Sequence, residues 1–151
     1  MGDYSTNQIQ RGDVWHFMGE NGGDIEERDG FITMTTFVET LINYCLFGGN
    51  EDDDGSAATS NKQFWGNENE PKERQLRGKL QSMLDGRPLT SALLPTFQDA
   101  AKDDIKSGAQ GYIDTVFVSA SISAPNRLDL FISVTDAQGT PYEVNLRGIT
   151  V

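Results

Sequence analysis

The last third of the chain alternates apolar and polar residues, and this pattern constrains the fold more than any other feature of the sequence. The alternation runs through 115–123, 127–135 and 142–146. Residues on one face of a β-strand recur at every second position. The segments are separated by 124–126 and 137–139, which contain the turn residues Pro, Asn and Gly. Three strands joined by such short turns predict an antiparallel meander.

A helical period precedes the meander. Apolar residues cluster on one arc over 37–47, and two glycines from Gly48 onward are expected to end this helix. Thr36, followed by Glu39 three residues later, has the spacing of a capping box. The opposite arc is expected to be polar and exposed, and it carries Glu39, Thr40 and Asn43.

Two more helices are expected before the meander. One is predicted over 73–84, with four inward positions: Leu76, Leu80, Met83 and Leu84. The other repeats apolar residues at steps of four: Leu93, Phe97, Ala101 and Ile105. Its regular part is expected to begin near Pro95, because proline fits the first helical turn better than the interior. About three helices followed by an antiparallel sheet predict an α+β fold with the helices on one sheet face.

The N-terminal part is expected to contain an extended segment over 1–12 and a short strand, or a hairpin, from residue 13 onward. The strand prediction rests on 13–18, which is apolar on both faces, and glycine-containing turns follow it. We expect 13–151 to form a single domain with a long acidic surface loop at 50–70. The only large apolar side chains of that loop are those of Phe64 and Trp65.

Charge and composition exclude several classes of function. The net charge is -11, yet 71–151 holds nine acidic and nine basic residues, so the excess lies before residue 71. An acidic chain is repelled by nucleic-acid phosphate and anionic lipid, so neither is an expected partner. One cysteine, Cys45, and one histidine, His16, remove an internal disulfide and most zinc designs. We expect no cofactor, no metal and no catalytic residue.

Two alternatives remain open from the residues. Residues 50–55 match part of a calcium loop centred on Asp52 and Asp54, but position twelve is Asn61 where that motif has a bidentate Glu. This alternative is an acidic calcium-binding adaptor. The other is a tail-associated cell-wall hydrolase that uses Glu39 and a loop carboxylate, because glycoside hydrolysis needs two carboxylates beside a cleft.

Short motifs in a fixed order, spread over about 13–147, resemble the Mu-type phage baseplate protein family often called phage protein GP46. They are similar in kind to the short wedge proteins of contractile tails. The motifs are Gly23-Asp24-Ile25, Asp29-Gly30-Phe31, Cys45-Leu46-Phe47, Phe64-Trp65-Gly66-Asn67, Leu89-Thr90 and Arg127-Leu128-Asp129-Leu130. The fourth motif stands where the family tends to have Trp-Trp-Gly-Asp.

The resemblance implies a non-enzymatic, structural wedge subunit of a phage tail baseplate. Such a subunit is assembled in the host cytoplasm and repeated around a six-fold particle, the virion tail. Its implied partners are other wedge proteins and the subunits of the tail sheath or tube. It also implies a role in attaching or nucleating the sheath, in part by sharing β-strands.

Five residues are the candidates for binding partners. Phe64 and Trp65 form an aromatic anchor that docks either on the protein itself or on a neighbour. Phe117 and Phe131 share the half-polar face of the meander, where an antiparallel register brings them diagonally close. The alternative for this face is cover by the N-terminal strand or a helix of the same chain. Arg147 begins a tail, 147–151, that either lengthens a sheet edge or forms an arm.

Overall fold

The computed structural model describes residues 12–14, 16–19, 22–25, 27–28, 30–32, 34–49, 71, 73 and 75–151. The chain divides into two compact units, Met1–Leu41 and Ile42–Val151. The predictions for residues 1–11 and for the acidic loop at 50–70, including the anchor Phe64 and Trp65, lie outside the described residues. The prediction of a single domain over 13–151 stays a prediction.

Six short strands make up most of the described N-terminal unit. They pair antiparallel as β1 (Gly12–Val14) with β6 (Met34–Thr36), β2 (His16–Gly19) with β3 (Gly22–Ile25), and β4 (Glu27–Arg28) with β5 (Phe31–Ile32). The predicted hairpin is therefore present. The single strand expected over 13–18 is wrong in extent, because β1 pairs with a distant segment whereas β2 folds back on the segment that follows it.

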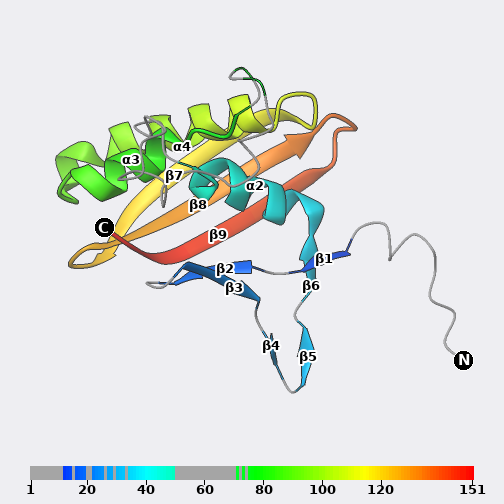
Figure 1. The fold of residues 1–151 in the computed structure, drawn as a ribbon. Coiled ribbons are helices and arrows are strands. Elements are labelled where there is room, and N and C mark those ends of the chain that lie inside the picture. Colours follow the sequence, from blue (N-terminus) through cyan, green and yellow to red (C-terminus); the bar gives the residue numbers. More distant parts are fainter. Residues whose placement is uncertain are drawn as a thin grey trace, which may run out of the picture. The chain divides into compact units, whose positions relative to one another are not determined.

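The helices are α2 (Phe37–Phe47), α3 (Lys79–Gly86) and α4 (Leu94–Gly108), with a short 3-10 helix η4 (Ser91–Leu93) before α4 (Figure 1). α2 ends where expected, and the N–H of Gly48 donates to the carbonyl of Tyr44 at 2.8 Å. Pro95 lies in the first turn of α4, as predicted. No helix in the described part of the chain has the length and apolar character to span a membrane.

α3 begins six residues later than the predicted 73–84. Gly78 is extended, with φ -76° and ψ 125°, and its N–H donates to the carbonyl of Gly49 at 2.9 Å. Glycine is a poor helix former, so this backbone contact outweighs the periodicity that extends N-terminally to Leu76. Leu80, Met83 and Leu84 are buried, as the pattern predicts.

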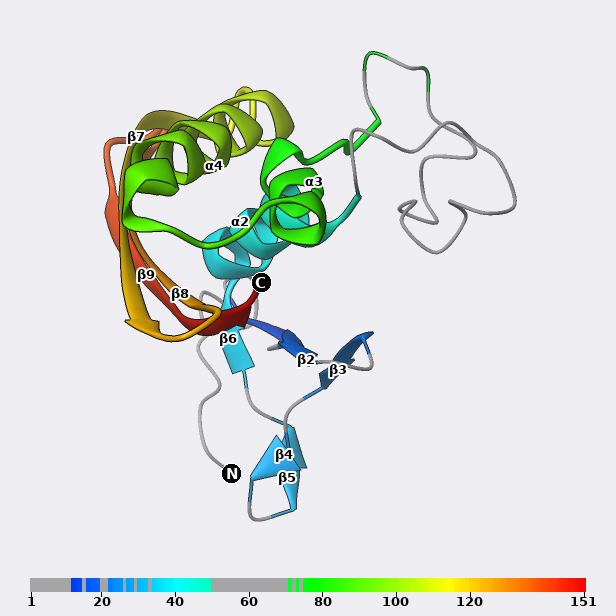
Figure 2. The same cartoon turned by 90° about the vertical axis from the view of Figure 1, so that its left-hand side faces the viewer.

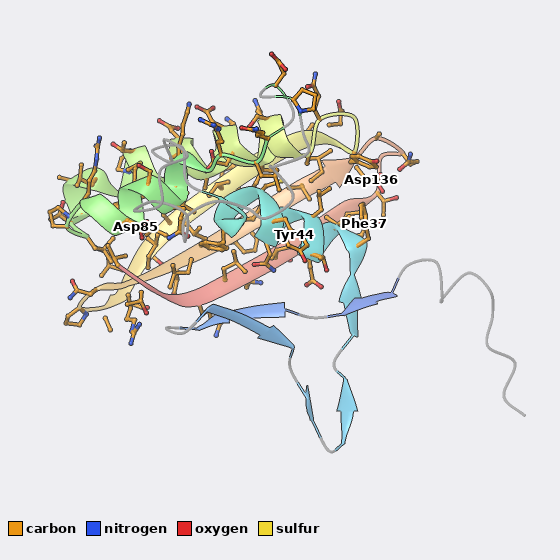
Figure 3. All side chains as sticks on the ribbon, viewed as in Figure 1. Phe37, Tyr44, Asp85 and Asp136 are labelled. Carbon is orange, nitrogen blue, oxygen red and sulfur yellow. The ribbon has the colours of Figure 1, made fainter. Side chains whose placement is uncertain are left out.

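The faces of α2 match the prediction in part. Val38, Ile42, Cys45 and Leu46 are buried on the expected arc. Thr40 was expected on the exposed arc, yet it is 8% exposed. A threonine presents a methyl group beside its hydroxyl, so a second side of the helix can be buried without an apolar residue. Phe37 and Tyr44, expected among the buried positions, are instead among the exposed large side chains on this helix (Figure 3).

The C-terminal sheet has the predicted topology. Strands β7 (Ile113–Ala124), β8 (Arg127–Asp136) and β9 (Pro141–Thr150) follow one another as an antiparallel meander in the order β7-β8-β9. Asn126 and Gly139 take positive φ of 56° and 85° in the two turns, a conformation that Asn and Gly adopt at low cost. Together with the helices, the sheet gives the expected α+β fold.

The core lies between one face of this sheet and the helices (Figure 2). α4 packs against both β7 and α3. Helix residues at the centre of the core are Ile42, Leu46, Leu80, Phe97 and Ile105, each 0% exposed. Sheet residues facing them are Val118, Leu128, Leu130, Ile132, Val134, Val144 and Leu146. Because every second sheet position is used for the core, the intervening side chains form a second face.

Candidate docking surface

The outer face is the side of the sheet that carries the side chains between the core positions. The strand register arranges its centre in three rows across β7, β8 and β9. Phe131 lies opposite both Ser119 and Asn145, which forms the middle row, and Ser133 lies opposite both Phe117 and Glu143 in the row beside it. The third row, on the other side, contains Ser121, Asp129 and Arg147: Ser121 pairs with Asp129, and Arg147 follows Leu146, the last residue of β9 that pairs with β8 before the register shifts.

Two phenylalanines dominate the outer face. Phe117 is 61% exposed and Phe131 is 36% exposed. Since Ser119 is the direct partner of Phe131 and Phe117 lies two residues before it, the two rings are diagonal neighbours. This confirms the geometry predicted from the sequence. The helices α3 and α4 lie on the opposite face of the sheet (Figure 2). Neither of these two helices therefore covers the rings of Phe117 and Phe131.

Most of the side chains around the two rings are uncharged. Hydroxyl side chains occupy the neighbouring outward positions: Thr115, Ser119, Ser121, Ser133 and Thr135. Of the charged residues in the central rows, Glu143 and Arg147 lie at row ends on β9, whereas Asp129 lies on β8, in the middle of its row and two residues from Phe131. An aromatic centre surrounded mostly by hydroxyl side chains, with few charged residues, is the composition of a protein-protein contact.

Asp129 fixes an irregularity in β9 at the border of this surface. The register between β8 and β9 shifts after Leu128, and Gly148 takes a φ of 67° there. One oxygen of Asp129 accepts the Gly148 N–H at 2.7 Å and the Ser123 hydroxyl at 2.9 Å. These two donors, with the nearby charge of Arg147, lower the pKa of Asp129 below its ordinary value. The carboxylate thereby satisfies a backbone donor that the shifted ladder leaves unpaired.

The two edges of the sheet differ. Gln98 on α4 accepts the Ala120 N–H at 3.2 Å, so a helix side chain caps the free edge of β7. The β7 register is also irregular near both ends. Along β9 the register is regular over 141–146, and in the described part of the chain β9 pairs with β8 alone. Bulges and side-chain caps protect an edge from further pairing, so β9 is the more receptive edge.

Of the predicted partner-binding residues, the structure brings Phe117, Phe131 and Arg147 onto one face. Arg147 is exposed. The tail that it begins lengthens β9 as far as Thr150 and does not form an arm. Val151 extends the pairing of this tail beyond β9, because its N–H donates to the carbonyl of Asn126 at 3.2 Å.

A separate pocket of about 300 Å³ lies among the helices. Its walls include Cys45, Arg77 and Asp104. Burial, with the charge of Asp104, raises the pKa of the Cys45 thiol to about 12, so the thiol stays protonated and unreactive. Asp104 is 4% exposed, and its two oxygens accept the N–H groups of Lys79 and Leu80 at 2.9 and 2.8 Å. We therefore assign Asp104 a structural role, because both of its carboxylate oxygens bind backbone N–H groups of α3.

Asp104 was missed by sequence reasoning, although one signal was available. It follows Phe97 by seven residues, so the helical period places it on the inward stripe of α4. A carboxylate in that stripe needs buried donors, and the first N–H groups of another helix are suitable ones.

The residues of the two alternative functions are only partly described. Glu39 lies in the first turn of α2 and is half-buried. Asp52 and Asp54 lie outside the described residues. Within the residues the structure describes, no group of three or more His, Cys, Asp or Glu side chains is arranged to hold a metal ion.

No protein-family model and no curated protein matches the chain. The likeness to phage baseplate proteins therefore remains a resemblance carried by its short motifs.

Proposed function

We propose that the protein is a structural wedge subunit in the baseplate of a contractile phage tail or a phage-derived particle. It docks other wedge proteins and helps to attach or nucleate the tail sheath. The observation that carries this proposal is the outer face, which exposes Phe117 and Phe131 amid hydroxyl side chains. Exposed aromatic side chains at the centre of a weakly charged patch are the usual anchors of protein docking.

The order of the sequence motifs supports the choice of a phage tail baseplate as the assembly. Their resemblance to the Mu-type baseplate family implies a wedge position in a six-fold tail. The acidic excess before residue 71, set against a neutral remainder, suits docking between subunits because charge complementarity fixes orientation.

The free edge of β9 supports a specific location for the proposed sheath contact. Ala120 directs its N–H to Gln98 and away from β8, so strand alternation fixes the direction of the backbone groups across the sheet. By that alternation, Glu143 and Asn145 direct their N–H and C=O groups to the free edge of β9. A partner's strand that added there would extend the sheet. Pro141 and the shifted register at Gly148 limit this edge to about five residues.

The proposal is tested by complementation of particles that lack the subunit. The double variant Phe117→Ser with Phe131→Ser should fold, since both rings are on the outer face, but it should yield tails without complete sheaths under the electron microscope. The matched control is Tyr112→Ser, because Tyr112 is 60% exposed and lies before β7, outside the three rows. Normal sheathed tails from the double variant would refute a docking role for this face.

A second variant tests the C-terminal meander as the joining surface. Deletion of 148–151 together with Phe131→Ser removes the end of β9 and one aromatic anchor at the same time. If the shortened subunit folds and still supports tails with full sheaths, the C-terminal meander is not the surface that joins it to the wedge or sheath.

A further inference from the structure

The outer face is complementary to itself. Its middle row, Ser119, Phe131 and Asn145, is flanked on one side by the row Phe117, Ser133 and Glu143 and on the other by the row Ser121, Asp129 and Arg147. Each flanking row holds what the other lacks. One has a large ring where the other has a small serine, a hydroxyl where the other has a carboxylate, and an acid where the other has a base.

We propose that the outer face binds a second copy of this chain through a twofold axis that runs along the middle row. Such an axis lies between the two sheets and crosses the strands, so each strand faces its own equivalent in the second copy with the direction reversed. The middle rows then meet each other, and each flanking row meets the opposite flanking row. This is an isologous contact, in which one patch serves both subunits.

The pairs that this axis creates are all favourable. Phe131 packs on Phe131 of the second copy, and Phe117 fits over Ser121 of the second copy, so large side chains meet small ones. The rest of the contact is polar, and Asp129 lies against the hydroxyl of Ser133 of the second copy.

The charged ends of the rows meet in the same way. Arg147 faces Glu143 of the second copy, and the symmetry repeats this ion pair. Within one copy these two residues are four positions apart on β9, a separation of about 13 Å, so they cannot pair with each other.

The electrostatics of the chain permit this contact. The net charge of -11 arises before residue 71, whereas 71–151 is balanced at nine acidic and nine basic residues. The three central rows hold two acids and one base: Glu143 and Arg147 lie at row ends on β9, and Asp129 lies in the middle of its row on β8. Twisted sheets stack face to face at about 30° with about 10 Å between them. The long side chains of Glu143 and Arg147 can span the offset that this angle produces.

This inference rests on the proposed function in one respect, that the outer face docks protein, and it names the partner as a second copy. The free edge of β9 stays available in such a pair, so strand addition and self-pairing use different groups. Self-association of the isolated chain and sheath completion in particles are therefore separate measurements. If the isolated protein is monomeric and its outer-face variants still yield tails without complete sheaths, self-pairing is refuted and the proposed wedge role is not.

Charge exchange tests the pairing directly. Sedimentation velocity of the full chain should show a monomer-dimer equilibrium at micromolar concentration. Glu143→Arg and Arg147→Glu should each weaken the dimer by about tenfold or more, because the symmetry turns two ion pairs into two like-charge contacts. The double exchange should restore the dimer to within about threefold, because opposite charges face each other again.

The control and the second measurement keep the result interpretable. Asp99→Arg makes the same change of charge on an exposed position of α4 and should leave the dimer unchanged. In Asn145→Cys the new thiol lies on the axis, so a short bis-maleimide should join two copies, whereas Asp99→Cys should not be joined. The native Cys45 is 3% exposed and does not compete.

A wild-type chain that stays monomeric at several hundred micromolar overturns the proposal. A dimer that neither single exchange weakens also overturns it, and so does a dimer that the double exchange fails to restore. Either result would mean that the two copies meet at another surface, such as residues 12–36.

Discussion

The carboxylate of Asp104 on α4 accepts the backbone N–H of Leu80 at 2.8 Å, so α3 is capped by a side chain from a different helix. Its other oxygen accepts the N–H of Lys79 at 2.9 Å. Gly78, the residue at the N-cap position, has no side chain that could do this. The start of α3 is thus determined by a residue about two dozen positions later in the chain, and the charge of the carboxylate suits the positive end of the helix dipole.

Replacement of this cap should destabilise the fold. Asp104→Ala leaves two N–H groups of α3 without their acceptor inside the core and should lower the free energy of unfolding by about 2 kcal/mol. The measurement is equilibrium urea denaturation. Asp103→Ala is the control, since Asp103 makes an exposed ion pair with Lys79 at 3.2 Å and should cost no more than about 0.5 kcal/mol. Equal losses in the two variants would contradict the capping role.

Gly78 should not tolerate a side chain. A Cβ there would lie 2.9 Å from the carbonyl oxygen of Gly49 and 3.1 Å from that of Leu46, both of them backbone atoms that cannot rotate away. Gly78→Ala should therefore cost about 1–3 kcal/mol in urea denaturation. Gly86→Ala at the end of α3 meets nothing within 4 Å and should change stability by less than about 0.5 kcal/mol. If Gly78→Ala is as stable as the parent, α2 and α3 do not approach this closely.

The sheet was predictable because its information is local. Val116, Val118, Leu130 and Ile132 alternate with polar residues in the sequence and face the core in the structure. The turns carry Asn126 and Gly139 where positive φ is required. The alternation and the turn positions together determine the strand register, and the register places Phe117 and Phe131 as diagonal neighbours. The main part of the candidate surface could therefore be predicted from the sequence.

The helices were less predictable where a distant contact decides. The period of α3 extends back to Leu76, but the bond from Gly78 to Gly49 and the cap from Asp104 set its first residue at 79. Neither partner is near it in sequence. The asymmetry of the sheet edges was hidden for the same reason, because the contact of Gln98 with Ala120 joins two elements 22 residues apart.

Cys45 should be inert in the folded protein. Its thiol is buried, and the pKa raised to about 12 leaves very little thiolate at neutral pH. A disulfide reagent at about pH 8 should react with less than a tenth of the protein until urea unfolds it, after which one thiol per chain should react. Rapid reaction of the folded protein would mean that the pocket beside Cys45 opens.

Asp129 should make stability depend on acid pH. The Gly148 N–H, the Ser123 hydroxyl and the charge of Arg147 favour the ionised form, so the pKa in the folded state lies below its value in the unfolded chain. The unfolded state therefore takes up the proton more readily. The contribution of this group is fully present above the unfolded pKa of about 3.9 and is lost as the pH falls through the lower folded pKa. The thermal midpoint of the wild type should fall between about pH 5 and about pH 2. The midpoint of Asp129→Asn should fall less, because its amide oxygen can still accept the Gly148 N–H but does not titrate.

Asp114→Asn on β7, which leaves the Gly148 contact intact, should follow the wild-type profile. The Gly148 amide resonance should shift with the same titration in the wild type and stay constant in Asp129→Asn. A Gly148 signal that does not respond to acid in the wild type would show that the carboxylate does not hold the β9 irregularity.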